Sequence, residues 1–116
     1  MERRLTAPHA GRVTRIVITW IRHSNPAGEQ ADAWALLELR RLLELPEVER
    51  VELTRLEPAC EQHGHPGDYL CELWLREGAD VAACLRRPEC DGWLCDLRML
   101  GMRPALGVAY ASDEVR

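Results

Sequence analysis

The stretch VTRIVITWIRH (residues 13–23) decides the fold of this chain. It is rich in β-branched residues, which favour a pleated strand. Alternate residues of a strand point to opposite faces of its sheet, and here both sets are apolar. One set is Ile16, Ile18 and Trp20, and the other includes Val17 and Ile21. A strand with two apolar faces belongs in the middle of a sheet, with cover on both sides.

The residues beyond this strand alternate between helical and extended patterns. Turn and helix-start residues at 24–30 end the strand, and Pro46 stands where the following helix should stop. The expected elements are, in order, a strand at 13–23, a helix at 27–47, strands at 48–57 and 68–77, a helical region at 78–102 and a strand at 103–111.

Both helical regions carry apolar residues at helical spacing. In the first these residues are Trp34, Leu37, Leu42 and Leu45. Pro88 divides the second region into a short piece and a longer piece, and Gly101 stands where a C-cap glycine is expected. The longer piece carries Trp93, Leu94, Leu97 and Leu100.

This β-α-β-β-α-β order predicts an α+β protein with the ferredoxin-like fold, in which a four-stranded antiparallel sheet carries two helices on one face. We expect a single domain at 13–111, a flexible N-terminal segment at 1–12 and a C-terminal tail at 112–116. Two helices cover only one face of the sheet, yet the first strand is apolar on both faces. The simplest second cover is another copy of the same sheet, so we expect a homodimer through the sheet face.

The chain resembles the dimeric α/β-barrel superfamily, which includes EthD-like proteins, antibiotic-biosynthesis monooxygenases, polyketide cyclases and stress-responsive barrel proteins. The resemblance extends from RIVITWIRH (15–23) through RPALGVAYA (103–111). Within it, LRRPECDGWLCDLRMLGM (85–102) looks like the broken second helix of that group. The resemblance is architectural and assigns no subfamily.

The composition narrows the classes of function. The chain has 116 residues and a net charge of −4, which gives no electrostatic footprint for nucleic acid. All 15 basic residues are arginines, so chemistry that needs a lysine amine is excluded for these residues. No glycine-rich phosphate loop or nucleophile elbow is present, and we expect no cofactor.

The five cysteines favour a reducing compartment. Their spacing contains no C-x-x-C pair, and no segment looks like a secretory signal or a membrane span. We therefore expect a cytoplasmic protein with free thiols and no membrane partner. Cys71, Cys84 and Cys95 are expected in the core, and Cys90 beside the helix break is expected to be exposed and oxidisable.

Three histidines are expected along one edge of the sheet. The first strand ends at His23, and the second strand runs parallel to it, into a loop that holds His63 and His65. The turn before the last strand belongs to the same edge. We take His23 as the candidate for proton transfer and His65 or His63 as its orienting partner. A solvent-exposed histidine at a strand end remains the plainer alternative.

The loop offers a weaker alternative as a metal site. Cys60, His63 and His65 supply a thiolate and two imidazoles, which are ligands for transition metals. The H-x-H spacing is not diagnostic, and a solvated hairpin loop is the plainer interpretation.

A pocket wall is expected on the face that carries His23. Counting back by twos gives Ile21 and Thr19, and the third strand places Trp74 and Glu72 opposite them. Glu72 could act as a general base there, or form an ion pair with Arg76 or Arg15, which we favour. If the other face lines the interface, no obvious chemistry lies there.

Two classes of function follow. The first is a small cofactor-independent enzyme that oxygenates, cyclises or isomerises a hydrophobic aromatic or polyketide-like metabolite in the barrel cavity, as the resemblance implies. Its catalytic residues would be His23, His65 and Glu72, and its binding residues Thr19, Ile21, His63 and Trp74. The second is a non-catalytic dimer that binds a ligand or a partner.

Overall fold

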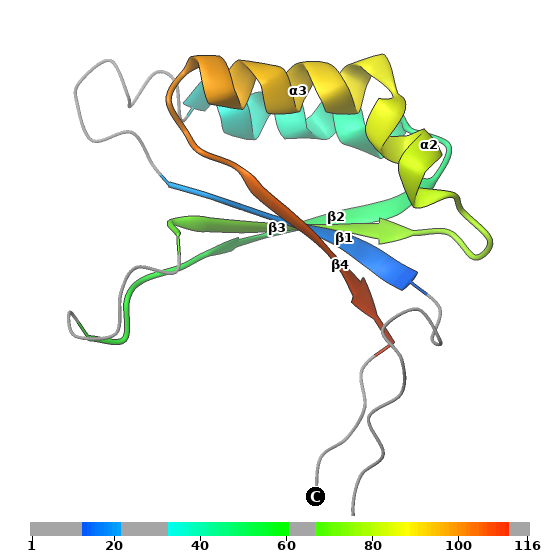
Figure 1. Cartoon of the computed structure of the whole chain (residues 1–116), viewed down its shortest axis with the longest axis horizontal. Coiled ribbons are helices and arrows are strands. Elements are labelled where there is room, and N and C mark those ends of the chain that lie inside the picture. Colours follow the sequence, from blue (N-terminus) through cyan, green and yellow to red (C-terminus); the bar gives the residue numbers. More distant parts are fainter. Residues whose placement is uncertain (1–12, 22–32, 61–66, 112–116) are drawn as a thin grey trace, which may run out of the picture.

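The computed structural model describes residues 13–21, 33–60 and 67–111. The strands are β1 (Val13–Trp20), β2 (Val48–Arg55), β3 (Tyr69–Leu75) and β4 (Ala105–Tyr110), and the helices include the 3₁₀ helix η1 (Leu39–Glu44), α2 (Val81–Arg86) and α3 (Pro88–Met99). The strands form one sheet in the order β2-β3-β1-β4, and every neighbouring pair is antiparallel (Figure 1).

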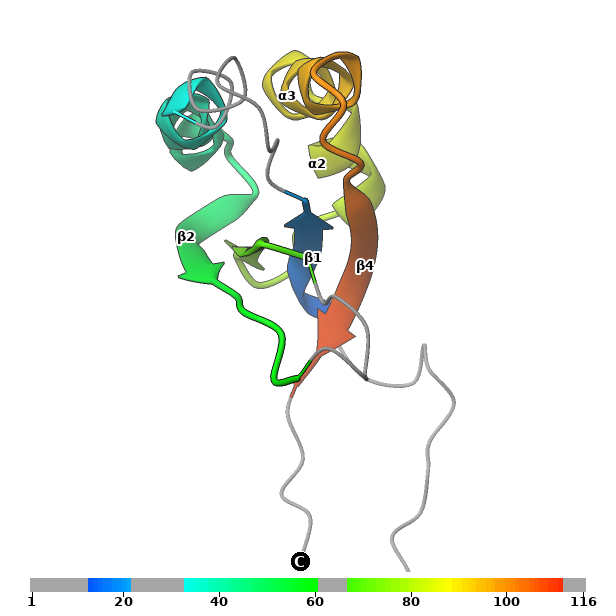
Figure 2. The ribbon, with the colours of Figure 1, turned by 90° about the vertical axis from the view of Figure 1, so that its left-hand side faces the viewer.

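The predicted ferredoxin-like α+β fold is confirmed. β1 and β2 both pair antiparallel with β3, so they run parallel to each other on either side of it. The helices lie together on one side of the sheet, and no described helix covers the other side (Figure 2). This second side is called the open face below.

The two central strands each separate a buried row from a half-buried one. In β1, Ile16, Ile18 and Trp20 are fully buried beneath the helices, and the residues between them are half-buried on the open face. β3 follows the same alternation: Tyr69, Cys71, Leu73 and Leu75 face the helices, and Leu70, Glu72 and Trp74 face away. Val17 and Thr19 therefore lie on the open face, as the first of the two predicted face assignments requires.

The predicted apolar face of the first helical segment is wrong at Leu37. Residues 33–38 are α-helical and pass directly into η1. The buried residues are Ala35, Leu39, Leu42 and Leu45, and Leu37 is 62% exposed. The first step of four residues suits an α-helix, and the next two steps of three suit a 3₁₀ helix, whose residues at i and i+3 eclipse. The change of helix type thus moves Leu37 off the buried face.

The break in the second helical region is confirmed. α2 ends at Arg86 and α3 begins with Pro88 at its first position, where a missing N–H costs nothing. Asp80 caps α2 by accepting hydrogen bonds from the N–H groups of Ala82 and Ala83. After α3, Gly101 has a φ of +80°, the left-handed conformation that favours glycine at a helix end.

Two of the cysteine predictions are wrong. Cys90 is fully buried, and Cys95 is exposed. The reason is the phase of α3, in which Cys90, Trp93, Leu94 and Leu97 fall at i, i+3, i+4 and i+7 and form its buried face. Cys71 and Cys84 are buried, as expected.

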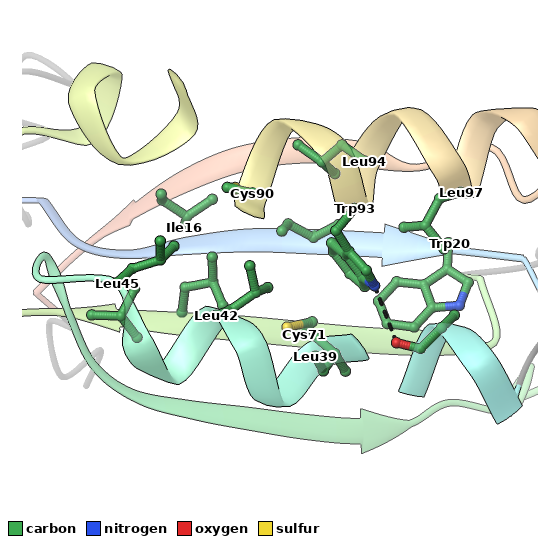
Figure 3. Packing of buried hydrophobic residues seen from close by; sticks show 14 of the residues in the cluster. Ile16, Trp20, Leu39, Leu42, Leu45, Cys71, Cys90, Trp93, Leu94 and Leu97 are labelled. Atoms are coloured by element: carbon green, nitrogen blue, oxygen red, sulfur yellow. Dashed lines mark hydrogen bonds between the residues drawn. The ribbon is translucent and has the colours of Figure 1, made fainter. Parts of the chain in front are cut away.

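The core is centred on two tryptophans between the sheet and the helices (Figure 3). The rings of Trp20 and Trp93 meet edge to face, with centroids 5.3 Å apart. The indole Nε1 of Trp93 donates a hydrogen bond of 3.1 Å to the carbonyl oxygen of Ala35, which links α3 to the first helical segment. Within the described parts of the chain, no helix is long and apolar enough to cross a membrane.

Candidate functional site on the open face of the sheet

The register of the strands orders the open face into rows that run across the sheet. The cationic row contains Arg15, Trp74 and Arg50, from β1, β3 and β2 respectively. The next row, two residues along each strand, contains Val17, Glu72 and Glu52 and is called the acidic row. A third row contains Thr19, Leu70 and Thr54.

A β-bulge brings β2 into this arrangement. The pairing of β2 with β3 shifts register between Val48 and Arg50. Val48 is fully buried beneath the helices, whereas Arg50 pairs with Trp74 on the open face. Without the bulge, residues two apart would share a face, so the bulge is the reason that a core valine is followed by a charged row.

Trp74 is held between two arginines. The guanidinium carbon of Arg15 lies 4.7 Å from the centre of the indole ring, and that of Arg50 lies 4.3 Å from it. The two arginines come from the strands on either side of β3. Cation–π contacts of this kind stabilise the indole in place. They also occupy the surface on which an aromatic ligand would stack, so Trp74 is less available as a stacking wall than the sequence suggests.

Glu72 forms an ion pair with Arg15. The Nε of Arg15 lies 2.6 Å from Oε2 of Glu72, and the two side chains are 19% and 18% exposed. The contact is close enough for charge pairing but is not aligned as a hydrogen bond from Nε. This is the pairing that the sequence favoured over a free catalytic base.

β4 contributes only small side chains to the open face. Ala109, Gly107 and Ala105 pair with Arg15, Val17 and Thr19, respectively. They lie on the side away from the helices, so they do not serve to admit a helix closely. A methyl group added at Gly107 would meet no atom within 4 Å. The face is therefore recessed over β4 and raised over β3 and β2, where the larger side chains stand.

The predicted binding residues do not form one cluster. Thr19 and Trp74 share the open face, but Trp74 is level with Arg15, four residues from Thr19 along β1. At about 3.3 Å per residue, that separation is about 13 Å along the strand. Ile21 follows the end of β1 and is 48% exposed. Thr19 and Ile21 therefore belong to one end of the face, and Glu72 and Trp74 to its centre.

His23, His63 and His65 lie outside the described residues, so their convergence stays a prediction. The residues that flank them do meet at one edge of the sheet. The N–H of Asp68 donates a 2.9 Å hydrogen bond to the carbonyl oxygen of Trp20, at the end of β1. A Cβ on Gly67 would lie 3.3 Å from the same oxygen. The described residues that border the two histidine-bearing segments thus adjoin there.

The metal alternative gains no support from the described part of the chain. Cys60 is exposed, and the two histidines proposed beside it lie outside the described residues. Among residues 13–21, 33–60 and 67–111, no group of three or more metal-ligating side chains is assembled.

A small hollow of about 90 Å³ lies on the other side of the sheet, between the first helical segment and α3. It is smaller than typical small-molecule pockets, which range from about 300 to 1,000 Å³. Its lining residues are Trp34, Glu38, Arg41, Pro88, Glu89, Gly92, Trp93 and Asp96. The hollow is not connected with any predicted site residue.

Arg15, Arg50 and Glu52 complete the open face beside the predicted residues. The sequence predicted Arg15 only as a possible partner of Glu72 and did not predict Arg50 or Glu52. The signal for Arg50 and Glu52 is the imperfect alternation of VERVELTR (48–55), in which a bulge moves these charged residues to one face. Such a shift becomes visible only once the pairing with β3 is known.

The chain has the ferredoxin-like fold, and the solved structures that it resembles share this fold. Neither family models nor curated protein sequences match it. A dimeric ferredoxin-like protein of unknown function from Thermobifida fusca superposes with a TM-score of 0.62 at 12% identity, over 88% of this chain and 93% of that one. HapK from Hahella chejuensis gives a TM-score of 0.55 at 17% identity, over 88% and 98% of the two chains.

An ethyl tert-butyl ether D (EthD) family protein from Bacillus halodurans is similar to the same extent. Its TM-score is 0.57 at 11% identity, and the alignment covers 83% of this chain and 97% of that one. The resemblance to dimeric ferredoxin-like and EthD-type proteins is thus confirmed at the level of the fold, and it assigns no subfamily.

Proposed function

We propose that this protein acts as a homodimer that closes its open face against a second copy and encloses a small hydrophobic molecule there. The observation that carries the proposal is the open face itself. Its central strands present half-buried Val17, Thr19 and Leu70, and no described helix covers them. Val17 and Leu70 give the centre of this face half-buried apolar surface, which suits cover by a second layer. The dimeric state named for the Thermobifida fusca protein supports a dimer of this chain.

The third row is the place that we propose for the ligand. Thr19 and Leu70 stand beside the small Ala105 of β4, where the face is recessed. The row combines apolar contact surface with hydroxyl groups that can orient a ligand, the usual composition of a small-molecule pocket. The ligand class follows the sequence resemblance: a hydrophobic, aromatic or polyketide-like metabolite.

Catalysis is the finer part of the proposal. Both acids on the described open face, Glu72 and Glu52, are paired with arginines. A proton transfer in a cofactor-independent oxygenation, cyclisation or isomerisation would therefore depend on His23, with His65 or His63 orienting it. The paired acids also favour the second candidate function, a non-catalytic dimer that binds a ligand or a partner. With either function, we expect the protein in the cytoplasm, where free thiols persist.

The oligomeric state tests the first part. Sedimentation of the full chain should show a dimer. Val17→Asp puts a second carboxylate beside Glu72, and it should sediment as a monomer that circular dichroism shows to be folded. Glu44→Asp, on the helical layer, is the control and should remain dimeric. A monomeric wild-type protein would remove the proposal.

The role of His23 separates the two candidates. A panel of aromatic and polyketide-like compounds is screened for binding by calorimetry and for turnover by mass spectrometry of the products. In an enzyme, His23→Ala lowers turnover while ligand binding and the dimer persist. In a binding protein, the wild type binds a compound without converting it, and His23→Ala changes its affinity modestly or not at all.

A further inference from the structure

On the open face, the positive charges lie in one row and the negative charges lie in the next row. The cationic row places Arg15 and Arg50 on either side of Trp74. The acidic row places Glu52 directly opposite Glu72 in the register of β2 and β3. Like charges opposite each other on neighbouring strands destabilise a sheet, so this pair needs compensation.

Compensation within the chain is incomplete. Glu72 pairs with Arg15, and Glu52 accepts a hydrogen bond of 2.7 Å from Nε of Arg50. The second pair is open to solvent, with side chains 55% and 47% exposed. An exposed pair of this kind contributes little by itself, because water screens both charges. Arg50 and Glu52 therefore remain accessible to charges on a partner.

Two aligned stackings of this face on a second copy differ in how they match the rows. If the two-fold axis runs along the strands, each row lies over the same row of the partner. The order of the strands is then reversed between the copies. With the axis at the centre of the sheet, Glu72 lies over the partner's Val17, and Arg50 and Glu52 lie over small residues of the partner's β4. If the axis runs across the strands and passes between the two rows, each cationic row lies over an acidic row. Packed sheets face each other at about 10 Å, close enough for such side chains to meet.

We propose that the dimer is of the second kind, with the two-fold axis across the strands and the cationic row of each copy over the acidic row of the other. This inference rests on the proposed dimer and specifies its geometry. Each Arg50 then faces the partner's Glu52, and each Glu72 faces the indole and guanidinium groups around the partner's Trp74. The alternative stacking is less favourable because it places Arg50 and Glu52 over uncharged residues of the partner's β4 and gives them no complementary charge.

The arrangement also separates the charged contact from the ligand. Thr19 and Leu70 lie one row beyond the acidic row, on the side away from the axis. The paired charges would fix the orientation of the two sheets, and the third row of each copy would remain available to a small molecule. The dimer would then hold two equivalent sites, one at each end.

Charge reversal in two separate chains tests this geometry. Arg50→Glu and Glu52→Arg are made as single variants, and dimer dissociation constants are measured for each alone and for their mixture by sedimentation. In each homodimer both cross-contacts become repulsive, so we expect dimerisation to weaken by about tenfold or more. In the mixed dimer, each contact between positions 50 and 52 again joins one acid to one guanidinium group, so mixing should restore the wild-type affinity.

The controls make each outcome decisive. Glu44→Arg carries the same charge change as Glu52→Arg but lies on η1, and it should leave the dimer unchanged. A wild-type dimer with single variants no weaker than Glu44→Arg would overturn this geometry and leave the proposed dimer standing. Tighter association of Glu52→Arg would indicate that Glu52 lies near acids of the partner and would also overturn this geometry. If the single variants dimerise weakly and mixing does not restore the affinity, the effect arises within one chain, and the proposed geometry is overturned as well. A monomeric wild-type protein would remove both the proposed dimer and its geometry.

Discussion

Glu47 accepts two hydrogen bonds from Arg87, one on each carboxylate oxygen. Nε of Arg87 lies 3.1 Å from Oε1, and the second guanidinium nitrogen, Nη2, lies 2.7 Å from Oε2. Arg87 is the residue between α2 and α3, and Glu47 immediately precedes β2. The pair thus ties the helix break to the edge of the sheet across 40 residues of sequence. Bidentate pairs of this type are the stronger and more directional ion pairs.

We expect this pair to make stability depend on pH. The hydrogen bonds from Arg87 hold the pKa of Glu47 below its ordinary value of 4.5. A carboxyl whose pKa is lower in the folded state stabilises the fold fully above its unfolded-state pKa, and this contribution is lost as the pH falls through the folded-state value. Glu47→Gln should therefore lower the melting temperature at neutral pH, and the difference from wild type should shrink in acid.

Thermal unfolding of both proteins over a pH series provides the measurement. Glu49→Gln, which changes an exposed glutamate two residues further on, in β2, is the matched control and should follow the wild type throughout. A gap between wild type and Glu47→Gln that stayed constant into acid would show that the charge of Glu47 is not the cause.

The order of the elements and the break in the second helical region were predictable because their signals are local. Pro88 cannot extend the preceding helix, and Gly101 adopts a positive φ that few other residues tolerate. The faces of β1 and β3 follow from simple alternation. Each of these signals needs only neighbouring residues, so one sequence suffices.

The errors arose where the local period changes or where a partner strand decides. The transition from α-helix to η1 shifts the phase that sequence spacing assumes, and Leu37 becomes exposed. The bulge at Val48 and Arg50 depends on pairing with β3 and cannot be read from β2 alone. For the same reason the ion pair of Glu72 was one of several alternatives, and the rows of the open face were not foreseen.

Thiol labelling should distinguish two classes of cysteine. Cys60 and Cys95 are exposed, whereas burial raises the pKa of Cys71 to about 12, of Cys84 to about 11 and of Cys90 to about 12. The thiolate is the reactive form, so the buried thiols lack both access and ionisation. At about pH 8, Ellman's reagent should modify two of the five cysteines rapidly, and the other three only in denaturant.

Cys60→Ser and Cys95→Ser should each remove one rapid equivalent, and Cys90→Ser should remove none. Rapid labelling of Cys90, identified by peptide mapping, would contradict its burial in the packed face of α3.

Two glycine-to-alanine substitutions should have opposite effects. Gly67 has a φ of +98°, and an added Cβ would lie 3.3 Å from the carbonyl oxygen of Trp20. Gly67→Ala should therefore destabilise the protein by about 1–2 kcal/mol. Gly92 lies within α3, and a Cβ there meets no atom within 4 Å. Gly92→Ala should stabilise by about 0.5–1 kcal/mol, because alanine has the higher helix propensity.

Urea unfolding of the two variants and the wild type measures both differences under one set of conditions. Equal effects of the same sign would show that neither the positive φ of Gly67 nor the helical setting of Gly92 governs the result.

We expect the hydrogen bond between Trp93 and Ala35 to stabilise the fold in addition to the packing of the Trp93 ring. Trp93→Phe keeps an aromatic ring against Trp20 but leaves the buried carbonyl of Ala35 without this donor. A hydrogen bond of this kind contributes about 0.5–1.5 kcal/mol, so unfolding in urea should show a loss of at least that size. Trp34→Phe is the control, since Trp34 is only half-buried and belongs to the same helical layer. A loss at Trp93 no larger than at Trp34 would mean that packing, and not the hydrogen bond, joins α3 to the first helical segment.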